Sequence, residues 1–284
     1  MDLDPYLLLA AFGGGVFGAS IGALPAFILC GFATLVGAAI QASGGGAVVL
    51  DQVAFGPFLG PHIAFGGGVG AAAYAARRGL LPTGRDVSAS LMGLERADVL
   101  AVGGAFGAFG ALFEAGWGAM GLRDWTDTIA LTVVVSAVLA RLAFGRRGLF
   151  AARFAATDED VWLPWQRKPA LLVLAGLGMG LPSAWAALAM GAEGGGAVVG
   201  FGLTAASLTF LYGGAKMPVT HHIALPAAAA ALSFDCLIAG GLAGILGAFL
   251  GEAAARLLLN GGDSHIDPPA AAIATAILLI RLAA

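Results

Sequence analysis

Two histidines stand at matching places in a chain that is otherwise poor in ionisable residues. His62 and His222 are each followed by Ile-Ala, and a proline lies shortly before each of them. An imidazole can donate and accept hydrogen bonds, and it changes its charge near neutral pH. The pair therefore predicts either a solute or proton path that both histidines line, or two hydrogen-bonded histidines that only mark helix starts.

A carboxylate inside an apolar segment is the second candidate for chemistry. Asp51, with Gln52 beside it, lies in a stretch that closes with Gly-Pro-Phe-Leu-Gly-Pro and has no acidic counterpart later in the chain. Charge in an apolar environment is costly, so such a carboxylate predicts a cation or proton site. Lys216 is a candidate partner for Asp51, with an anchor at the membrane interface as the alternative.

Four further aspartates form two pairs, Asp98 with Asp235 and Asp127 with Asp267. Each stands where a helix is expected to begin, and an aspartate there accepts hydrogen bonds from free backbone N–H groups. Pro268 strengthens this interpretation for Asp267, because the fixed φ of proline suits the first helical position. We therefore expect helix capping by all four, with a place on a solute path as the alternative.

The paired residues follow from an internal duplication. Residues 98–111 return as residues 235–248, with the aspartate and four glycines in register. Three further matches keep the same order: 44–49 with 194–199, His62-Ile-Ala with His222-Ile-Ala, and Arg141-Leu-Ala with Arg281-Leu-Ala. A duplicated apolar unit predicts a transporter or channel built around a pseudo-two-fold axis.

The composition indicates a membrane protein. Hydrophobic residues make up 59% of the chain and charged residues 11%, and the mean hydropathy is +0.91. In ordinary soluble domains about a quarter of the residues are charged. Lipid is therefore the expected surrounding of most of the chain, and nothing indicates a nucleic-acid partner. Cys30 and Cys236 both lie in apolar runs and are expected to be unpaired and buried.

Apolar stretches predict an all-α integral membrane protein of about ten spans, since roughly 20 residues cross the hydrocarbon core. We expect a first repeat at 1–145, a cytoplasmic linker at 146–168 and a second repeat at 169–284. The predicted spans are 6–41, 44–60, 61–78, 97–116 and 127–145 in the first repeat, and 169–191, 195–213, 219–232, 234–254 and 267–284 in the second.

The first stretch of each repeat carries a break signal. Residues 6–41 fit one helix that breaks at Leu24-Pro25, with two short helices as the alternative, and Leu181-Pro182 marks the matching break in 169–191. We therefore expect five spans in each repeat, with broken or re-entrant segments.

The arginines set the expected orientation. They gather in the loop around 79–96 and in the linker 146–168, and basic loops face the cytoplasm. The N-terminus then lies outside, in the plasma (inner) membrane. Because five is an odd number, the second repeat enters the membrane from the opposite side, which makes the two repeats inverted.

Glycine motifs recur in both repeats. Gly103-Gly104-x-x-Gly107-x-x-Gly110 matches Gly240-Gly241-x-x-Gly244-x-x-Gly247. Nucleotide-binding glycines follow a strand, whereas these lie inside apolar runs of helix length. We expect them to let helix backbones approach each other closely in the membrane.

These patterns favour a membrane transporter or channel for a small polar solute or ion, with proton coupling through a histidine or Asp51 as an option. We expect no enzyme, no metal and no cofactor, because the only local cluster is His221-His222, and adjacent residues point about 100° apart on a helix. The alternative is a non-transporting membrane scaffold or accessory subunit of a larger complex. The small-residue faces are also compatible with a homo-oligomer.

Overall fold

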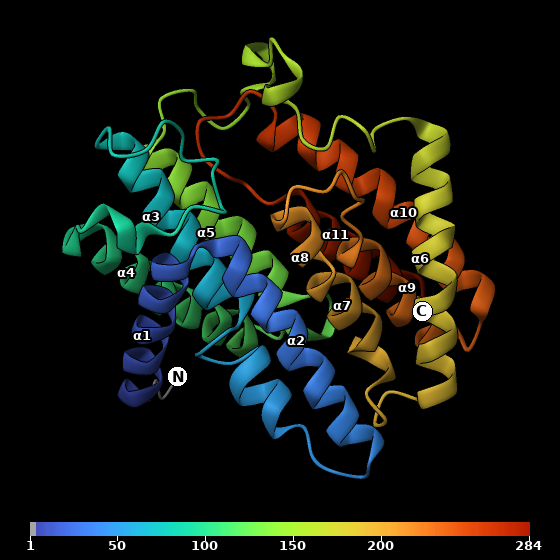
Figure 1. Cartoon of the computed structure of the whole chain (residues 1–284). Coiled ribbons are helices and arrows are strands. Elements are labelled where there is room, and N and C mark those ends of the chain that lie inside the picture. The colour runs from blue at the N-terminus through green and yellow to red at the C-terminus, as the bar shows by residue number, and fades with distance from the viewer. Residues whose placement is uncertain (1–3) are drawn as a thin grey trace.

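All regular elements between residues 4 and 284, the part of the chain that a computed structural model describes, are helices (Figure 1). The expected all-α fold is therefore confirmed. The α-helices are α1 (Pro5–Ile21), α2 (Ala23–Ala42), α3 (Gly66–Arg77), α4 (Ala97–Ala119), α5 (Thr128–Phe144), α6 (Pro169–Met190), α7 (Gly196–Ala206), α8 (Leu208–Tyr212), α9 (His221–Phe234), α10 (Leu237–Ala254) and α11 (Pro268–Ala283).

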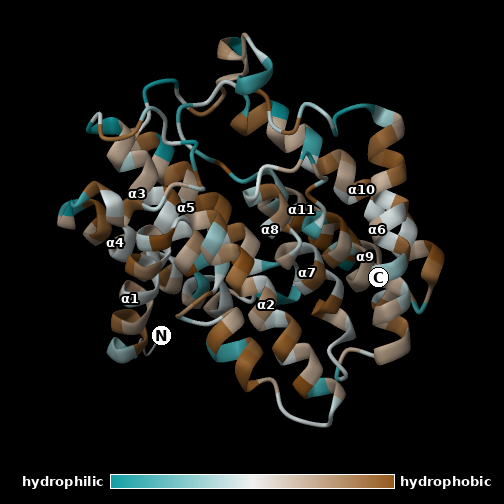
Figure 2. Ribbon diagram, viewed as in Figure 1, coloured by the Kyte–Doolittle hydropathy of each residue, from teal (hydrophilic) through white to brown (hydrophobic). Residues whose placement is uncertain are grey.

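Four helices are long and apolar enough to cross a membrane: α2, α4, α6, and α10 with its π-helical continuation to Leu259. Most of the remaining helices are apolar but shorter. Figure 2 shows hydrophobic residues over the helices and hydrophilic residues mainly in the loops, most densely along the upper edge. The chain is therefore suited to a membrane.

The stretch 6–41 forms two helices, α1 and α2, which is the alternative to a single broken helix. The chain turns at Gly22, whose φ of 101° favours glycine. Pro25 lies in the first turn of α2, where the missing N–H has no helical partner to lose. The expected break at Leu24-Pro25 is thus displaced to Gly22. The prediction of a matching break in the second half is wrong, because α6 continues through Pro182.

The predicted span at 44–60 is also wrong. Only a π-helical turn at Leu50–Ala54 forms there, followed by an irregular segment and a second π-helical turn, Pro61–Phe65, that leads into α3. Glycines and prolines between 56 and 61 explain the irregular backbone, because they end helices. The other predicted spans coincide with helices to within a few residues, although 195–213 is divided into α7 and α8 at Ser207.

The glycine motifs pack helices together, as the sequence predicts. A Cβ atom on Gly15 of α1 would collide with the backbone of α4 at Gly103 and Gly107. In the second half, a Cβ atom on Gly244 of α10 would collide with the backbone of α6 at Gly176. The same kind of contact therefore joins the first and fourth helices of the first half and their counterparts in the second half.

The two halves meet along α2 and α7. Gly31 lies against Ala205 and Ala206, whereas Gly195, at the other end of α7, lies against Ala38. This order makes the two helices antiparallel. The halves also contact each other through α5 and α11. There the hydroxyl of Thr126, just before α5, donates to the carbonyl oxygen of Ala274 at 2.7 Å.

Candidate functional site

A cavity of about 240 Å³ lies between the two halves. Its walls come from α2 and α5 of the first half, from α7, α8, α9 and α11 of the second, and from loops of both. Most of the lining side chains are apolar. The aromatic ones are Phe27, Phe55, Phe65, Trp162 and Phe201.

Two of the predicted aspartates line this cavity and cap helices. Asp127 accepts from the backbone N–H of Ala130 at 2.8 Å, and Asp267 accepts from that of Ala270, also at 2.8 Å. Each carboxylate thus stands at the positive end of a helix dipole, α5 or α11, which stabilises its charge. The capping prediction is confirmed for this pair. Because Asp127 and Asp267 also line the cavity, capping and a place on a solute path are not exclusive here.

His265 extends the polar part of the wall. Its Nε2 lies 3.2 Å from the Oδ1 atom of Asp267, and both residues line the cavity. His265 was not among the site residues that the sequence predicted. Its position two residues before an expected capping aspartate was the signal that could have identified it.

His221 is the cavity histidine of α9. Its ring packs against the rings of Phe27 and Phe201, with centroids 4.7 Å and 6.0 Å away. The residue is 5% exposed, and its Nδ1 atom is buried without a hydrogen-bond partner. Buried polar atoms in proteins are nearly always hydrogen-bonded. An unpartnered acceptor or donor that faces a cavity therefore indicates a place for a ligand.

The two histidines that the sequence favoured do not line the cavity. His222 is fully buried, and the ring lies close to Gly251 of α10. His62 is also buried, and its backbone carbonyl lies against Gly110 of α4. The two residues therefore have matching positions in the two halves but lie behind the cavity wall. The helical turn of about 100° per residue explains why His221 faces the cavity and His222 does not.

The other predicted polar residues lie away from the cavity. Asp51, Gln52 and Lys216 are exposed. Within residues 4–284 no ion pair joins Asp51 to Lys216. None of the three residues lines the cavity. The structure therefore does not bring this predicted site together.

The prediction that Asp98 and Asp235 cap helices is wrong. Asp98 lies inside the first turn of α4, where it forms a salt bridge of 2.9 Å with Arg96 and accepts from the hydroxyl of Tyr74. Asp235 follows the end of α9 with a left-handed φ of 47°, and Cys236 precedes α10. Tertiary partners and a sharp turn therefore replace the expected caps.

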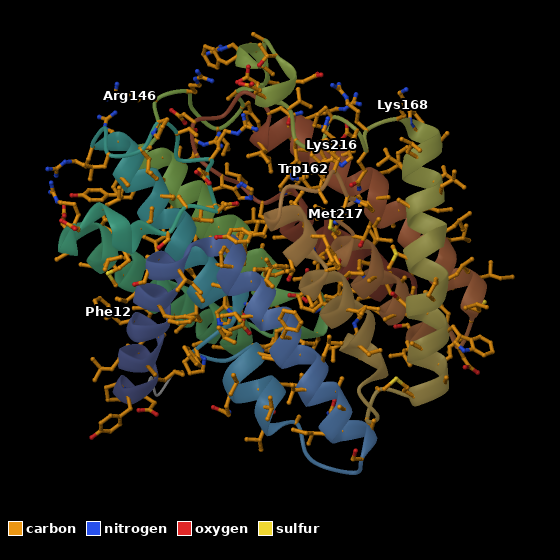
Figure 3. All side chains as sticks on the ribbon, viewed as in Figure 1. Phe12, Arg146, Trp162, Lys168, Lys216 and Met217 are labelled. Atoms are coloured by element: carbon orange, nitrogen blue, oxygen red, sulfur yellow. The ribbon has the colours of Figure 1, made fainter. Side chains whose placement is uncertain are left out.

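The linker covers one end of the cavity. Trp162 lines the cavity, and its backbone N–H donates to the Oδ1 atom of Asn260 at 2.9 Å. The indole N–H of Trp165 donates to the carbonyl oxygen of Met217 at 3.0 Å. Figure 3 shows Trp162, Lys216 and Met217 in the upper part of the view. The segment that joins the two halves is therefore part of the site.

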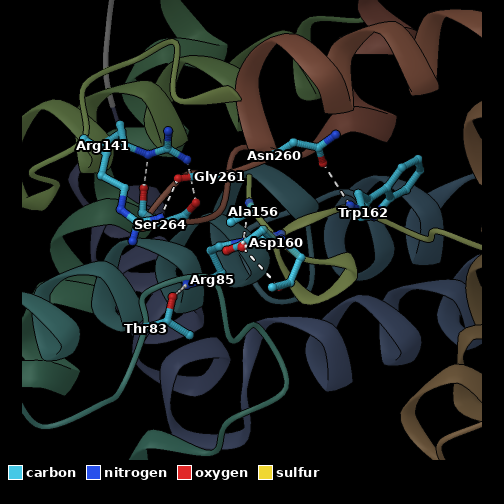
Figure 4. Close-up of polar contacts among 11 residues, drawn as sticks. Thr83, Arg85, Arg141, Ala156, Asp160, Trp162, Asn260, Gly261 and Ser264 are labelled. Carbon is cyan, nitrogen blue, oxygen red and sulfur yellow. Dashed lines mark hydrogen bonds and ion pairs between the residues drawn. The ribbon is translucent and has the colours of Figure 1, made fainter. Parts of the chain in front are cut away.

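A polar cleft of about 770 Å³ lies beside this cover, between the loops at 82–86, 144–147, 159–160 and 262–264. Asp160 closes it on the linker side, where backbone N–H groups of Ala156 and Thr157 donate to its carboxylate. These hydrogen bonds hold the pKa of Asp160 below its ordinary value. Arginine and carboxylate side chains both line the cleft, and Figure 4 shows the contacts around it.

Comparisons with known proteins yield one match. A family model, described as "Family of unknown function (DUF7973)", matches residues 1–152 and again residues 149–284. A match of one model to both halves is the result that an internal duplication produces. No curated protein and no solved structure matches the chain.

Proposed function

The chain belongs to the DUF7973 family, whose function is unknown, and we propose that it is a membrane transporter or channel for a small solute or ion. The path runs between the two halves. The observation that carries this proposal is the cavity of about 240 Å³ whose walls come from both halves and hold Asp127 and Asp267. A non-transporting scaffold would instead be expected to have a sealed interface between the halves.

The proposed architecture is two inverted repeats of five helices each. Helices α1 to α5 form the first repeat, and α6, α7, α9, α10 and α11 form the second. The matching glycine contacts support this assignment. Figure 1 supports the inversion, since α1 rises from the N-terminus toward the upper edge while α6 descends from it. In this scheme α2, and not the segment 44–60, corresponds to α7.

Labelling of single cysteines tests the inversion. We expect Ser233→Cys to react with a membrane-impermeant maleimide on intact cells, and Ser88→Cys and Thr157→Cys to react only after the cells are opened. Ser233 is exposed beside the α9–α10 turn, whereas Ser88 and Thr157 lie in the basic loop and the linker. A Cys236→Ser background removes the half-buried native thiol. Equal labelling of all three positions on intact cells would contradict the inverted arrangement.

Blocking the cavity tests transport. Ala270 is buried in the cavity wall, so the benzyl group of Ala270→Phe would occupy the space between the halves. The variant retains the backbone N–H of residue 270, which donates to the capping carboxylate of Asp267. In proteoliposomes we expect at least one solute from a set of cationic, neutral and anionic compounds to cross faster than in protein-free vesicles. We expect the variant to reduce that flux to near the protein-free rate.

Ala253→Phe is the matched control, because Ala253 is exposed on α10 outside the cavity. It should retain the flux of the unmodified protein. If Ala270→Phe also retained it, the path would lie elsewhere. If no compound of the three charge classes crossed faster than in protein-free vesicles, the scaffold alternative would replace the transport proposal.

A further inference from the structure

The charged groups of the cavity wall are all of one sign. Two carboxylates, Asp127 and Asp267, line the cavity, and no lysine or arginine is among its lining residues. The helix dipoles of α5 and α11 stabilise these carboxylates without neutralising them. A positively charged occupant would therefore meet two attractive groups and no repulsive fixed cation.

The remaining wall disfavours a bare metal cation. Ca²⁺ takes six to eight oxygen ligands and Mg²⁺ keeps several waters, whereas most of the cavity surface is apolar. Among residues 4–284, moreover, no group of three histidine, cysteine or acidic side chains is arranged to hold a metal ion. The apolar wall instead suits a cation that carries its own hydrocarbon body.

The aromatic rings suit such a cation. Phe27 packs edge-on against Phe65 and Phe201 at centroid distances of 5.8 Å, and all three rings line the cavity. Ring faces attract ammonium groups, most strongly when the cation is desolvated. Phe55 and, from the linker, Trp162 also line the cavity.

His221 adds a hydrogen-bonding group that the protein itself does not use. Its Nδ1 atom is buried and unpartnered, and the ring packs beside those of Phe27 and Phe201. A neutral imidazole nitrogen without a proton accepts one hydrogen bond. An N–H group of a ligand would provide the missing donor.

From these four features we infer that the cavity binds a small organic ammonium ion with an apolar body. The ammonium group pairs with the carboxylate of Asp267 and donates to His221, while the body packs among the aromatic rings and Asp127 adds a second negative charge to the wall. This inference rests on the proposed function, since it names the solute class of the same path.

Three isosteric probes test the inferred charge and body. Purified full-length protein in detergent is titrated with benzylammonium, benzyl alcohol and benzoate, and binding is measured by calorimetry. We expect benzylammonium to bind at least about tenfold more tightly than benzyl alcohol, on the scale of one desolvated cation–aromatic contact. Benzoate should show no binding. Equal binding of benzyl alcohol would overturn the cation assignment in favour of an apolar site. Absence of benzylammonium binding would also overturn the cation assignment.

Asparagine variants test the residues. Asn caps helices about as well as Asp, so Asp267→Asn and Asp127→Asn remove a charge and retain the cap. We expect Asp267→Asn to weaken benzylammonium binding at least about tenfold, Asp127→Asn to weaken it less, and both variants to leave benzyl alcohol binding unchanged. Asp98→Asn is the control, since Asp98 lies outside the cavity. Unchanged benzylammonium affinity in both cavity variants, with their melting temperatures retained, would overturn the inference.

Binding and flux separate this inference from the proposed function. If another solute class crosses in proteoliposomes and Ala270→Phe blocks it while benzylammonium does not bind, the solute class is wrong and the path remains. If benzylammonium binds with the expected charge dependence but neither it nor any other tested solute crosses, the transport proposal is wrong and the binding site remains.

Discussion

Replacement of Arg141 by alanine is expected to lower the free energy of unfolding by about 3–5 kcal/mol, the usual cost of removing one partner from a buried ion pair. The Arg141 side chain has 0% exposure, and its Nε atom lies 3.7 Å from the Oδ1 atom of Asp263. Its guanidinium also donates to the side-chain and backbone oxygens of Ser264 and to the carbonyl oxygen of Gly148. The contact with Ser264 is visible in Figure 4.

These contacts fix the loop that leads into the cavity. Ser264 is followed by His265 and Asp267, which line the cavity, so loss of the Arg141 contacts should loosen the polar wall as well. We therefore expect a lower melting temperature in detergent together with weaker benzylammonium binding. Arg141→Lys keeps the charge but lacks the planar fork of donors, and it should recover only part of the stability.

Arg281 provides the matched control for this experiment. It occupies the same place in the repeated sequence, but it is exposed at the end of α11. Arg281→Ala should change stability by no more than about 0.5 kcal/mol, as surface substitutions usually do. Equal melting temperatures of the Arg141→Ala and Arg281→Ala variants would contradict the role that we assign to Arg141.

The contrast between these two arginines shows why repeated sequence does not give repeated environment. Both follow the same apolar pattern, and both were expected near the end of a last span. The segment 260–267 packs beside the end of α5, however, and gives Arg141 its partners. Such long-range contacts depend on how the halves meet, which no local pattern encodes.

The candidate site was predictable where a residue's role is local. An aspartate before a helix caps it through neighbouring backbone N–H groups, and the sequence therefore identified Asp127 and Asp267. Which histidine faces the cavity depends instead on the rotation of α9 about its axis. The repeated His-Ile-Ala pattern does not contain that information, and it therefore favoured His222 over His221. Asp51 was favoured because it is unmatched in an apolar stretch, but it lies in the short π-helical turn Leu50–Ala54, where its side chain is exposed.

Glycine packing provides the second large effect, and the duplication makes it a paired experiment. A Cβ atom on Gly110 of α4 would collide with the backbone carbonyl oxygen of His62, and one on Gly247 of α10 with that of His222. Backbone atoms inside packed helices cannot move aside as a flexible side chain can. We expect Gly110→Ala and Gly247→Ala each to cost about 1–3 kcal/mol, the range for overpacked cores.

This loss should appear although alanine favours a helix over glycine by about 0.8–1.0 kcal/mol. Gly116→Ala on α4 and Gly178→Ala on α6 isolate that helix preference, because no atom lies within 4 Å of the added Cβ at either position. These two variants should melt at or above the temperature of the unmodified protein in the same detergent. If Gly110→Ala and Gly247→Ala did so too, close backbone approach would not hold the repeats together. If only one of them were destabilised, the two halves would not share this packing, and the argument for equivalent repeats would lose its strongest structural support.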